Sequence, residues 1–245
     1  MTPRFVLRSS EALNGLAEDG RLVPWRSHLL DAGSRQAGIR RETEFRHGRL
    51  SEVVEVLDNG RPANVSDLAA LTMAYVREIA MEIRDGRTSD WRQYWSFDAL
   101  NRRPERPKPE NECRNALLSD LRHRLQRMGV NAWEEGRYAN DTRADVTISF
   151  RDFKVPVETK RSCHPELWSG VRKQLIAKYS RDPGADGHGI YLVFWFGSTV
   201  HCRPTPGVGG TPISAHQLEK RLLEALSAKE RRKILVCVID VSIAD

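Results

Sequence analysis

Alternating apolar and polar residues mark two neighbouring strands in the second half of the chain. The apolar positions are Val146, Ile148, Phe150, Val155 and Val157. Because side chains on a strand alternate between its two faces, this pattern predicts two strands that each bury one face. Only residues 151–154 separate Phe150 from Val155, so a two-residue turn at Arg151-Asp152 would join the two runs as a hairpin.

Helical periodicities and one long apolar run surround this hairpin. Apolar residues recur at helical spacing over 110–128, where Gly129 can end the helix, and again over 166–180. Residues 189–196 are apolar nearly throughout, which is typical of a strand buried on both faces. A helix over 216–231 and a strand over 233–241 follow. The expected fold class is α/β, with a mixed central sheet flanked by helices.

The first hundred residues indicate a helical region. An apolar stripe over 64–83 predicts its main helix, whereas the proline-rich, charged segment 101–109 is typical of a linker. We therefore expect a helical N-terminal region with its linker over residues 1–105 and an α/β domain over 106–245. The helical region shows no recognisable chemistry. It would pack on the domain, hold substrate, or contact a second copy of the chain or a larger protein assembly.

The hairpin carries the candidate chemistry. If Phe150 pairs with Phe153, counting outward places Asp145 opposite Glu158, with Cβ atoms about 5 Å apart. Lys160 shares the face of Glu158, because residues two apart on a strand point the same way. Two carboxylates that close repel each other unless a cation lies between them. A divalent metal ion is the predicted occupant, with Lys160 beside it to hold a water molecule.

An acid followed by a hairpin and then by Glu158-Thr159-Lys160 resembles the PD-(D/E)xK, or restriction endonuclease-like, nuclease superfamily. The predicted order over residues 109–197, helix, three strands, helix and strand, is similar to the core order of that superfamily. The resemblance implies a Mg²⁺ site, with Mn²⁺ as a substitute, formed by Asp145, Glu158 and the main-chain carbonyl of Thr159. It implies that a glutamate early in the preceding helix completes the pocket. Glu112 is the matching position and Glu110 the second choice.

The sequence departs from the superfamily pattern in several places. Ala144 stands where the motif has proline, and Pro156 is unusual inside a central strand because it cannot donate a ladder hydrogen bond. Gln174 and Tyr179 are similar to a glutamine and a tyrosine of exonuclease-like members, but one extra residue separates them. Gln174 could line the pocket or lie on the surface, and Tyr179 is expected in the core.

Two plainer interpretations remain open for these motifs. Glu158 and Lys160 could be surface residues of a half-exposed strand, although the apolar residues between and before them argue against this. Asp152-Phe153-Lys154 matches the same tripeptide, but it falls at the predicted turn with no acid opposite, and we interpret it as a solvated hairpin tip.

Composition favours a polyanionic partner. The net charge is +6, the pI is about 9.3, and arginine outnumbers lysine, a bias that also arises in GC-rich bacterial genomes. The candidate nucleic-acid contacts are Arg102, Arg103, Arg106 and Arg143. The four cysteines show neither the spacing of a disulfide framework nor that of a zinc finger. Without a signal peptide or a membrane-length apolar segment, the chain is expected in the cytoplasm.

The sequence therefore predicts a Mg²⁺-dependent phosphodiesterase, an endo- or exonuclease that acts on DNA in preference to RNA. Asp145, Glu158, Lys160 and Glu112 are its predicted catalytic residues. The alternatives are an RNA nuclease, or a nucleic-acid-binding or assembly module that keeps the fold without catalysis.

Overall fold

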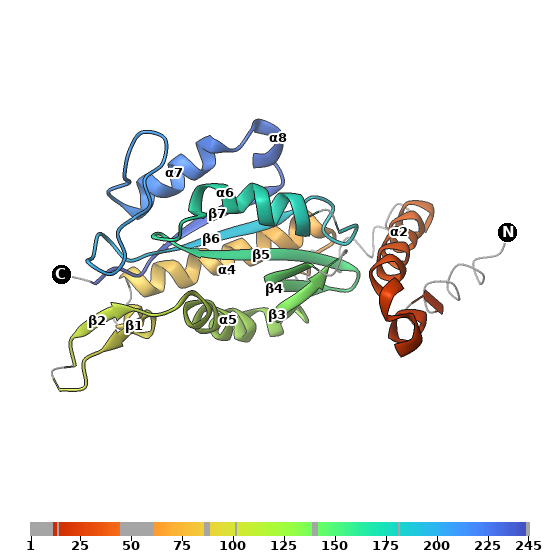
Figure 1. Ribbon diagram of the computed structural model, residues 1–245, viewed down its shortest axis with the longest axis horizontal. Helices are drawn as coiled ribbons and strands as arrows, with labels where there is room; N and C mark the ends of the chain where they lie inside the picture. Colours follow the sequence, from red (N-terminus) through yellow and green to blue (C-terminus); the bar gives the residue numbers. More distant parts are fainter. Residues whose placement is uncertain are drawn as a thin grey trace.

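A five-stranded mixed sheet between two layers of helices forms the body of the molecule (Figure 1). The computed structural model describes residues 12–13, 15–44, 61–85, 89–100, 102–138, 142–180 and 182–243. The strands of the sheet, in spatial order, are β3 (Asn131–Tyr138), β4 (Thr142–Phe150), β5 (Phe153–Arg161), β6 (Gly189–Trp195) and β7 (Ile234–Asp240). Neighbours from β3 to β5 are antiparallel, whereas β5, β6 and β7 are parallel. The predicted mixed α/β architecture is confirmed.

Helices cover both faces of the sheet. The helices of the described residues are η1 (Gly20–Trp25), α2 (Arg26–Glu44), α4 (Val65–Asp85), η2 (Asp90–Tyr94), α5 (Glu110–Gln126), α6 (Leu167–Gly170), η4 (Val171–Tyr179), α7 (Ala215–Ala225) and α8 (Ala228–Arg231). Of these, α2 stands apart from both layers (Figure 1). Apolar residues of α4 and α5 share a core with Ile148, Val155 and Ile190 on one face. On the other face, α6, η4 and α7 pack on Tyr191 and Val193. Strand β6 is buried along its whole length.

The β4–β5 hairpin has the predicted register. Phe150 pairs with Phe153, and pairing continues without a shift to Val146 and Val157. Pro156 causes no bulge, because it pairs with Thr147 in an unshifted register. Pairing with β6 begins only at the next residue. The N–H of Lys154, two residues earlier, points away from β4 and donates to the carbonyl of Gly184. The Pro156 nitrogen faces the same side, where no ladder hydrogen bond is required.

Helix α4 belongs to the same core as the sheet, although it lies in the predicted N-terminal region. Its inward residues Leu68, Val76 and Ile79 are buried with the apolar residues of β5 and β6. The division of the chain at residues 105 and 106 stays a prediction. The sequence pattern over residues 50–57 also predicts a short helix, and this stretch lies outside the described residues.

Most of the expected linker forms a β-hairpin instead. Strand β1 (Trp95–Phe97) pairs with β2 (Pro104–Pro107) as a separate two-stranded sheet. In Figure 1 this hairpin projects from the body beside the start of α5. The proline and charge content of the segment had indicated a linker, but prolines are tolerated on an edge strand, where their missing N–H needs no partner.

Two further expectations are corrected. Cys163 and Cys202 form a disulfide, although they stand 39 residues apart and show no paired spacing in the sequence. The predicted helix over 216–231 is two helices, because Ser227 caps α8 through a reciprocal pair of hydrogen bonds with Glu230. Among the described residues, no helix is long and apolar enough to cross a membrane.

The contact of α5 with the core gives a stability prediction. Leu118 of α5 is 1% exposed and lies in the core that α4, α5 and the sheet share. Leu100, at the tip of the β1–β2 hairpin, is 90% exposed. Leu118→Ala should lower the free energy of unfolding by about 2 to 5 kcal/mol because it leaves a cavity. Leu100→Ala should change it by less than about 0.5 kcal/mol. Urea unfolding of both variants measures these changes. Equal losses of unfolding free energy would contradict the burial of Leu118 in the core.

Candidate metal centre

The site begins where β4 and β5 separate. Their pairing ends at Val146 and Val157, one pair before the expected partners Asp145 and Glu158. Beyond this point, Oδ2 of Asp145 accepts hydrogen bonds from the main-chain N–H and from Oγ1 of Thr159, both at 2.8 Å. The carboxylate therefore takes the place that a main-chain carbonyl of β4 would fill in a continued ladder.

Glu158 and Lys160 form a buried ion pair on β5. Their registers with β6 place them beside Tyr191 and Val193, on the face covered by α6 and η4. The two side chains lie 2.6 Å apart, Nζ to Oε1, and the residues are only 3% and 4% exposed. A second carboxylate, that of Glu110, lies 3.4 Å from the same Nζ. A buried ammonium group requires such partners.

Electrostatic coupling brings Asp145 into the same group of charges. Burial raises the pKa of Glu158 most, the negative charge of Asp145 raises it further, and Lys160 opposes both, with a net pKa of about 7. Burial lowers the pKa of Lys160, but the charges of Glu158, Glu110 and Asp145 outweigh it and leave the pKa raised. Lys160 is therefore protonated at neutral pH.

Helix α5 supplies Glu110, whereas the sequence had favoured Glu112. Oε2 of Glu110 accepts a hydrogen bond of 3.0 Å from the main-chain N–H of Arg161, while Glu112 is exposed to solvent. The helix begins at Glu110, so a residue two positions later is rotated by about 200° around its axis. Cys113, three residues after Glu110, is buried, and this spacing was the signal in the sequence that Glu110 faces inward.

Arg114, one turn after Glu110, was not predicted. Its Nη1 lies 3.9 Å from Oδ1 of Asp145, and its Nη2 lies 3.9 Å from a carboxylate oxygen of Glu134. The side chain is 12% exposed. Helix α5 thus places one acidic residue, Glu110, and one positively charged residue, Arg114, at the point where β4 and β5 separate.

Gln174 and Tyr179 share one side of η4, which is a π-helix. Because a π-helix has hydrogen bonds between residues five apart, the extra residue between them does not move them to different faces. The negative charges of Glu158 and Asp145, after burial itself, raise the pKa of Tyr179 to about 12, which places its ring near the carboxylates. Gln174 donates to Glu166 at 3.2 Å, and its buried Oε1 has no hydrogen-bond partner.

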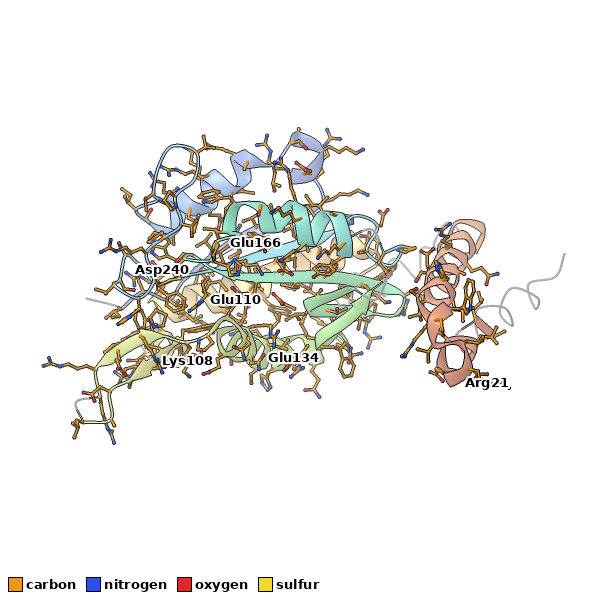
Figure 2. All side chains as sticks on the ribbon, in the orientation of Figure 1. Arg21, Lys108, Glu110, Glu134, Glu166 and Asp240 are labelled. Atoms are coloured by element: carbon orange, nitrogen blue, oxygen red, sulfur yellow. A yellow bond between two sulfur atoms is a disulfide. The ribbon has the colours of Figure 1, made fainter. Side chains whose placement is uncertain are left out.

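Figure 2 labels Glu110 and Glu166 on the two sides of β5.

The remaining predicted residues lie away from this cluster. Arg102, Arg103 and Arg106 are exposed on the β1–β2 hairpin. The side chain of Arg143 lies outside the described part of the chain. The second tripeptide match, Asp152 to Lys154, lies at the β4–β5 turn, as predicted.

The donors fit a hard divalent cation by their chemistry. Asp145, Glu158 and Glu110 supply carboxylate oxygens. The carbonyl of Thr159 faces the same gap as its N–H, because both main-chain groups of a strand residue point to one side. Among the described residues, however, no three His, Cys, Asp or Glu side chains converge in an arrangement that could hold a metal ion. Glu158 and Glu110 turn toward Lys160, and Asp145 turns toward Thr159.

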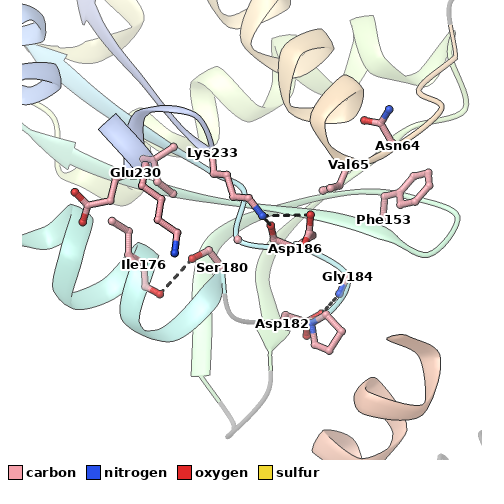
Figure 3. Close-up of a pocket in the computed structure, with 14 residues that line it drawn as sticks. Asn64, Val65, Phe153, Ile176, Ser180, Asp182, Gly184, Asp186, Glu230 and Lys233 are labelled. Carbon is pink, nitrogen blue, oxygen red and sulfur yellow. Dashed lines mark hydrogen bonds and ion pairs between the residues drawn. The ribbon is translucent and has the colours of Figure 1, made fainter. Parts of the chain in front are cut away.

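A separate cavity of about 770 Å³ lies at the opposite end of the sheet (Figure 3). It is lined by the start of β5 at Phe153 and by the loop before β6. Lys233 points into it but already binds the carbonyl and the carboxylate of Asp186, at 2.6 and 3.3 Å. Glu230 is paired with Arg172. These charges are compensated internally, so we place the candidate chemistry at the carboxylate cluster.

Comparison with known proteins gives one match. A family model described as Domain of unknown function (DUF8371) matches residues 77–198. That stretch contains Glu110, Asp145, Glu158, Lys160 and Tyr179. No curated protein matches the chain, and no solved structure does.

The raised pKa of Glu158 predicts how stability depends on pH in EDTA. The carboxyl group of Glu158 binds a proton more tightly in the folded state than in the unfolded state, where its pKa has the ordinary value of 4.5. The contribution of Glu158 to stability is therefore fully present below pH 4.5 and is lost as the pH rises through about 7. Glu158→Gln removes this dependence. Urea unfolding should show the variant gaining stability relative to wild type between pH 5 and 8, by about 3 kcal/mol at most. If the difference in unfolding free energy between variant and wild type stayed constant from pH 5 to 8, the buried environment assigned to Glu158 would be contradicted.

Proposed function

We propose that the chain is a metal-dependent nuclease with a restriction endonuclease-like core, which hydrolyses phosphodiester bonds of nucleic acid, DNA in preference to RNA. The observation that carries the proposal is the buried Lys160, held between Glu158 and Glu110 where β4 and β5 separate. The order α5, β3, β4, β5, α6 with η4, and β6 supports it, because this is the helix–strand order that the resemblance implied.

The residues divide into ligands and a proton donor. Asp145, Glu158 and the carbonyl of Thr159 would hold the metal ion, and Glu110, in place of Glu112, would complete the site directly or through water. Magnesium suits a set of oxygen donors, and when bound it lowers the pKa of a coordinated water and neutralises phosphate charge.

Lys160 acts through its charge and its protons. Its ammonium group stays protonated because three carboxylates surround it. With Glu158 as a metal ligand, Lys160 would have N–H groups available to orient a water molecule or to donate to a phosphate oxygen. Tyr179 and Gln174 line the same side and would contact the sugar or the phosphate. Contact with a second copy through the N-terminal helices stays a prediction.

Substitutions of the ion pair test catalysis. Glu158→Gln and Lys160→Ala should each lower the rate of DNA cleavage in Mg²⁺ by at least about 100-fold, because they remove a ligand charge or a transition-state donor. Binding of the same DNA should survive. Cleavage is measured on single-stranded DNA, double-stranded DNA and RNA, with EDTA as a control. Asp152→Ala and Lys154→Ala, at the second tripeptide match, should leave the rate near that of wild type.

The outcomes separate the alternatives. Activity that persists in EDTA, or that falls equally in the turn variants, would show that the wrong residues were chosen. Binding of every substrate without cleavage would favour a non-catalytic binding module, and cleavage of RNA alone would favour an RNA nuclease.

Two neighbouring acids on α5 offer a matched pair. Glu110→Gln should lower the cleavage rate by about tenfold or more, because it removes a charge that faces Lys160. Glu112→Gln makes the same chemical change on the exposed side of the helix and should leave the rate unchanged. A lower rate in Glu112→Gln with an unchanged rate in Glu110→Gln would make Glu112 the pocket residue and contradict the role of Glu110.

A further inference from the structure

The β1–β2 hairpin is built as a rigid projection. Its base is anchored by Trp95, which is buried, stacks edge-on against Phe196 and donates from Nε1 to the carbonyl of Val241 at 2.7 Å. Its strands pair from Trp95 with Pro107 to Phe97 with Pro104. At the tip, the main-chain N–H groups of Asp98 and Arg102 close the turn. The tip is therefore held by its own turn and by Arg92 of η2, whose Nη2 donates to the carbonyl of Arg102 at 3.5 Å.

The base of this hairpin adjoins the carboxylate cluster. The carbonyl of Lys108 accepts from Nη1 of Arg161, the residue after Lys160, at 3.5 Å. Pro107 and Pro109 flank Lys108, and their fixed φ angles restrict how the hairpin turns relative to α5. Glu110 follows directly and contacts Lys160. The hairpin and the cluster therefore lie at the same end of β5.

The tip combines positive charge with an exposed apolar side chain. Arg102, Arg103 and Arg106 are exposed, and Leu100 is 90% exposed between them and Phe97. Arg92 supports the hairpin by stacking over the ring of Phe97, with its guanidinium carbon 4.3 Å from the ring centre. Guanidinium groups bind phosphates through paired hydrogen bonds, and some DNA-binding proteins insert an apolar side chain such as leucine between bases.

We propose that the β1–β2 hairpin is a DNA-binding arm whose arginines grip the phosphate backbone and whose Leu100 packs against a base. This role rests on the proposed nuclease function, because it delivers the bound strand to the carboxylate cluster. Arg102 lies five positions before Pro107, so the arm reaches at most about 17 Å, at 3.3 Å per residue.

The charge of the arm is tested by salt dependence. The affinity for a 20-base-pair duplex is measured by fluorescence anisotropy in EDTA at several salt concentrations. The triple variant R102A/R103A/R106A should reduce the slope of log Kd against log salt by about 2 to 3, because up to three phosphate contacts are lost. The control variant K229A/R231A/R232A removes three exposed charges around α8 and should leave the slope unchanged. Equal slopes for the wild type, the triple variant and the control variant would overturn the proposed DNA-binding role of the hairpin.

The apolar tip is tested separately. Leu100→Ala should weaken binding of the same duplex by about three- to tenfold with an unchanged salt slope, because it removes a base contact but no charge. Val208→Ala is the matched control, since Val208 is 99% exposed on another loop. Unchanged affinity for Leu100→Ala would overturn the base contact.

Cleavage in Mg²⁺ distinguishes failure of the arm from failure of the nuclease function. Loss of cleavage in Lys160→Ala together with an unaltered salt slope in the arm variant would overturn only the arm. An arm-dependent slope in a wild-type protein that cuts nothing would support the arm and overturn the nuclease function. Wild-type protein that binds no DNA would overturn the arm.

Discussion

The buried charge of Lys160 constrains the arrangement of the elements around it. An ammonium group removed from water is tolerated only when carboxylates compensate it, and removal of one partner from such a pair costs about 3 to 5 kcal/mol. Glu158 lies on the same strand, but Glu110 must come from another element. The start of α5 is therefore held against the end of β5, and the hydrogen bond from Arg161 to Glu110 fixes the distance.

Asp145 explains why an opening exists at this place. Its carboxylate binds the N–H and the hydroxyl of Thr159, so the ladder between β4 and β5 cannot continue past Val146 and Val157. The separation leaves main-chain groups of β5 unpaired within the sheet and brings a third negative charge close to Glu158. Burial raises the pKa of Glu158 most, and the negative charge of Asp145 adds to this effect, so the additional carboxylate charge is unfavourable for the isolated protein. A bound cation would relieve it, so the same repulsion that lowers stability favours metal binding.

Patterns that depend on neighbours in the chain were predictable from the sequence. The register of the β4–β5 hairpin follows from the alternation of its apolar residues and the short turn, and the burial of β6 follows from its apolar run. Features that depend on distant partners were not. The π-helical winding of η4, the disulfide between Cys163 and Cys202 and the contact of Arg114 with Asp145 each depend on how separate elements pack. Glu110 could have been chosen over Glu112, because the inward stripe of α5 passes through it.

The connection from the arm to the cluster has a mechanical consequence. The hairpin, the proline-flanked Lys108 and the first turn of α5 are consecutive in the chain, and Arg161 binds the carbonyl of Lys108 from β5. The hairpin is therefore joined to Glu110 by a segment with restricted φ angles and not by a flexible linker. Glu110 contributes to the compensation of the Lys160 charge at 3.4 Å. If the hairpin binds nucleic acid as proposed, the short segment between β2 and α5 would connect that binding to the charges of the cluster.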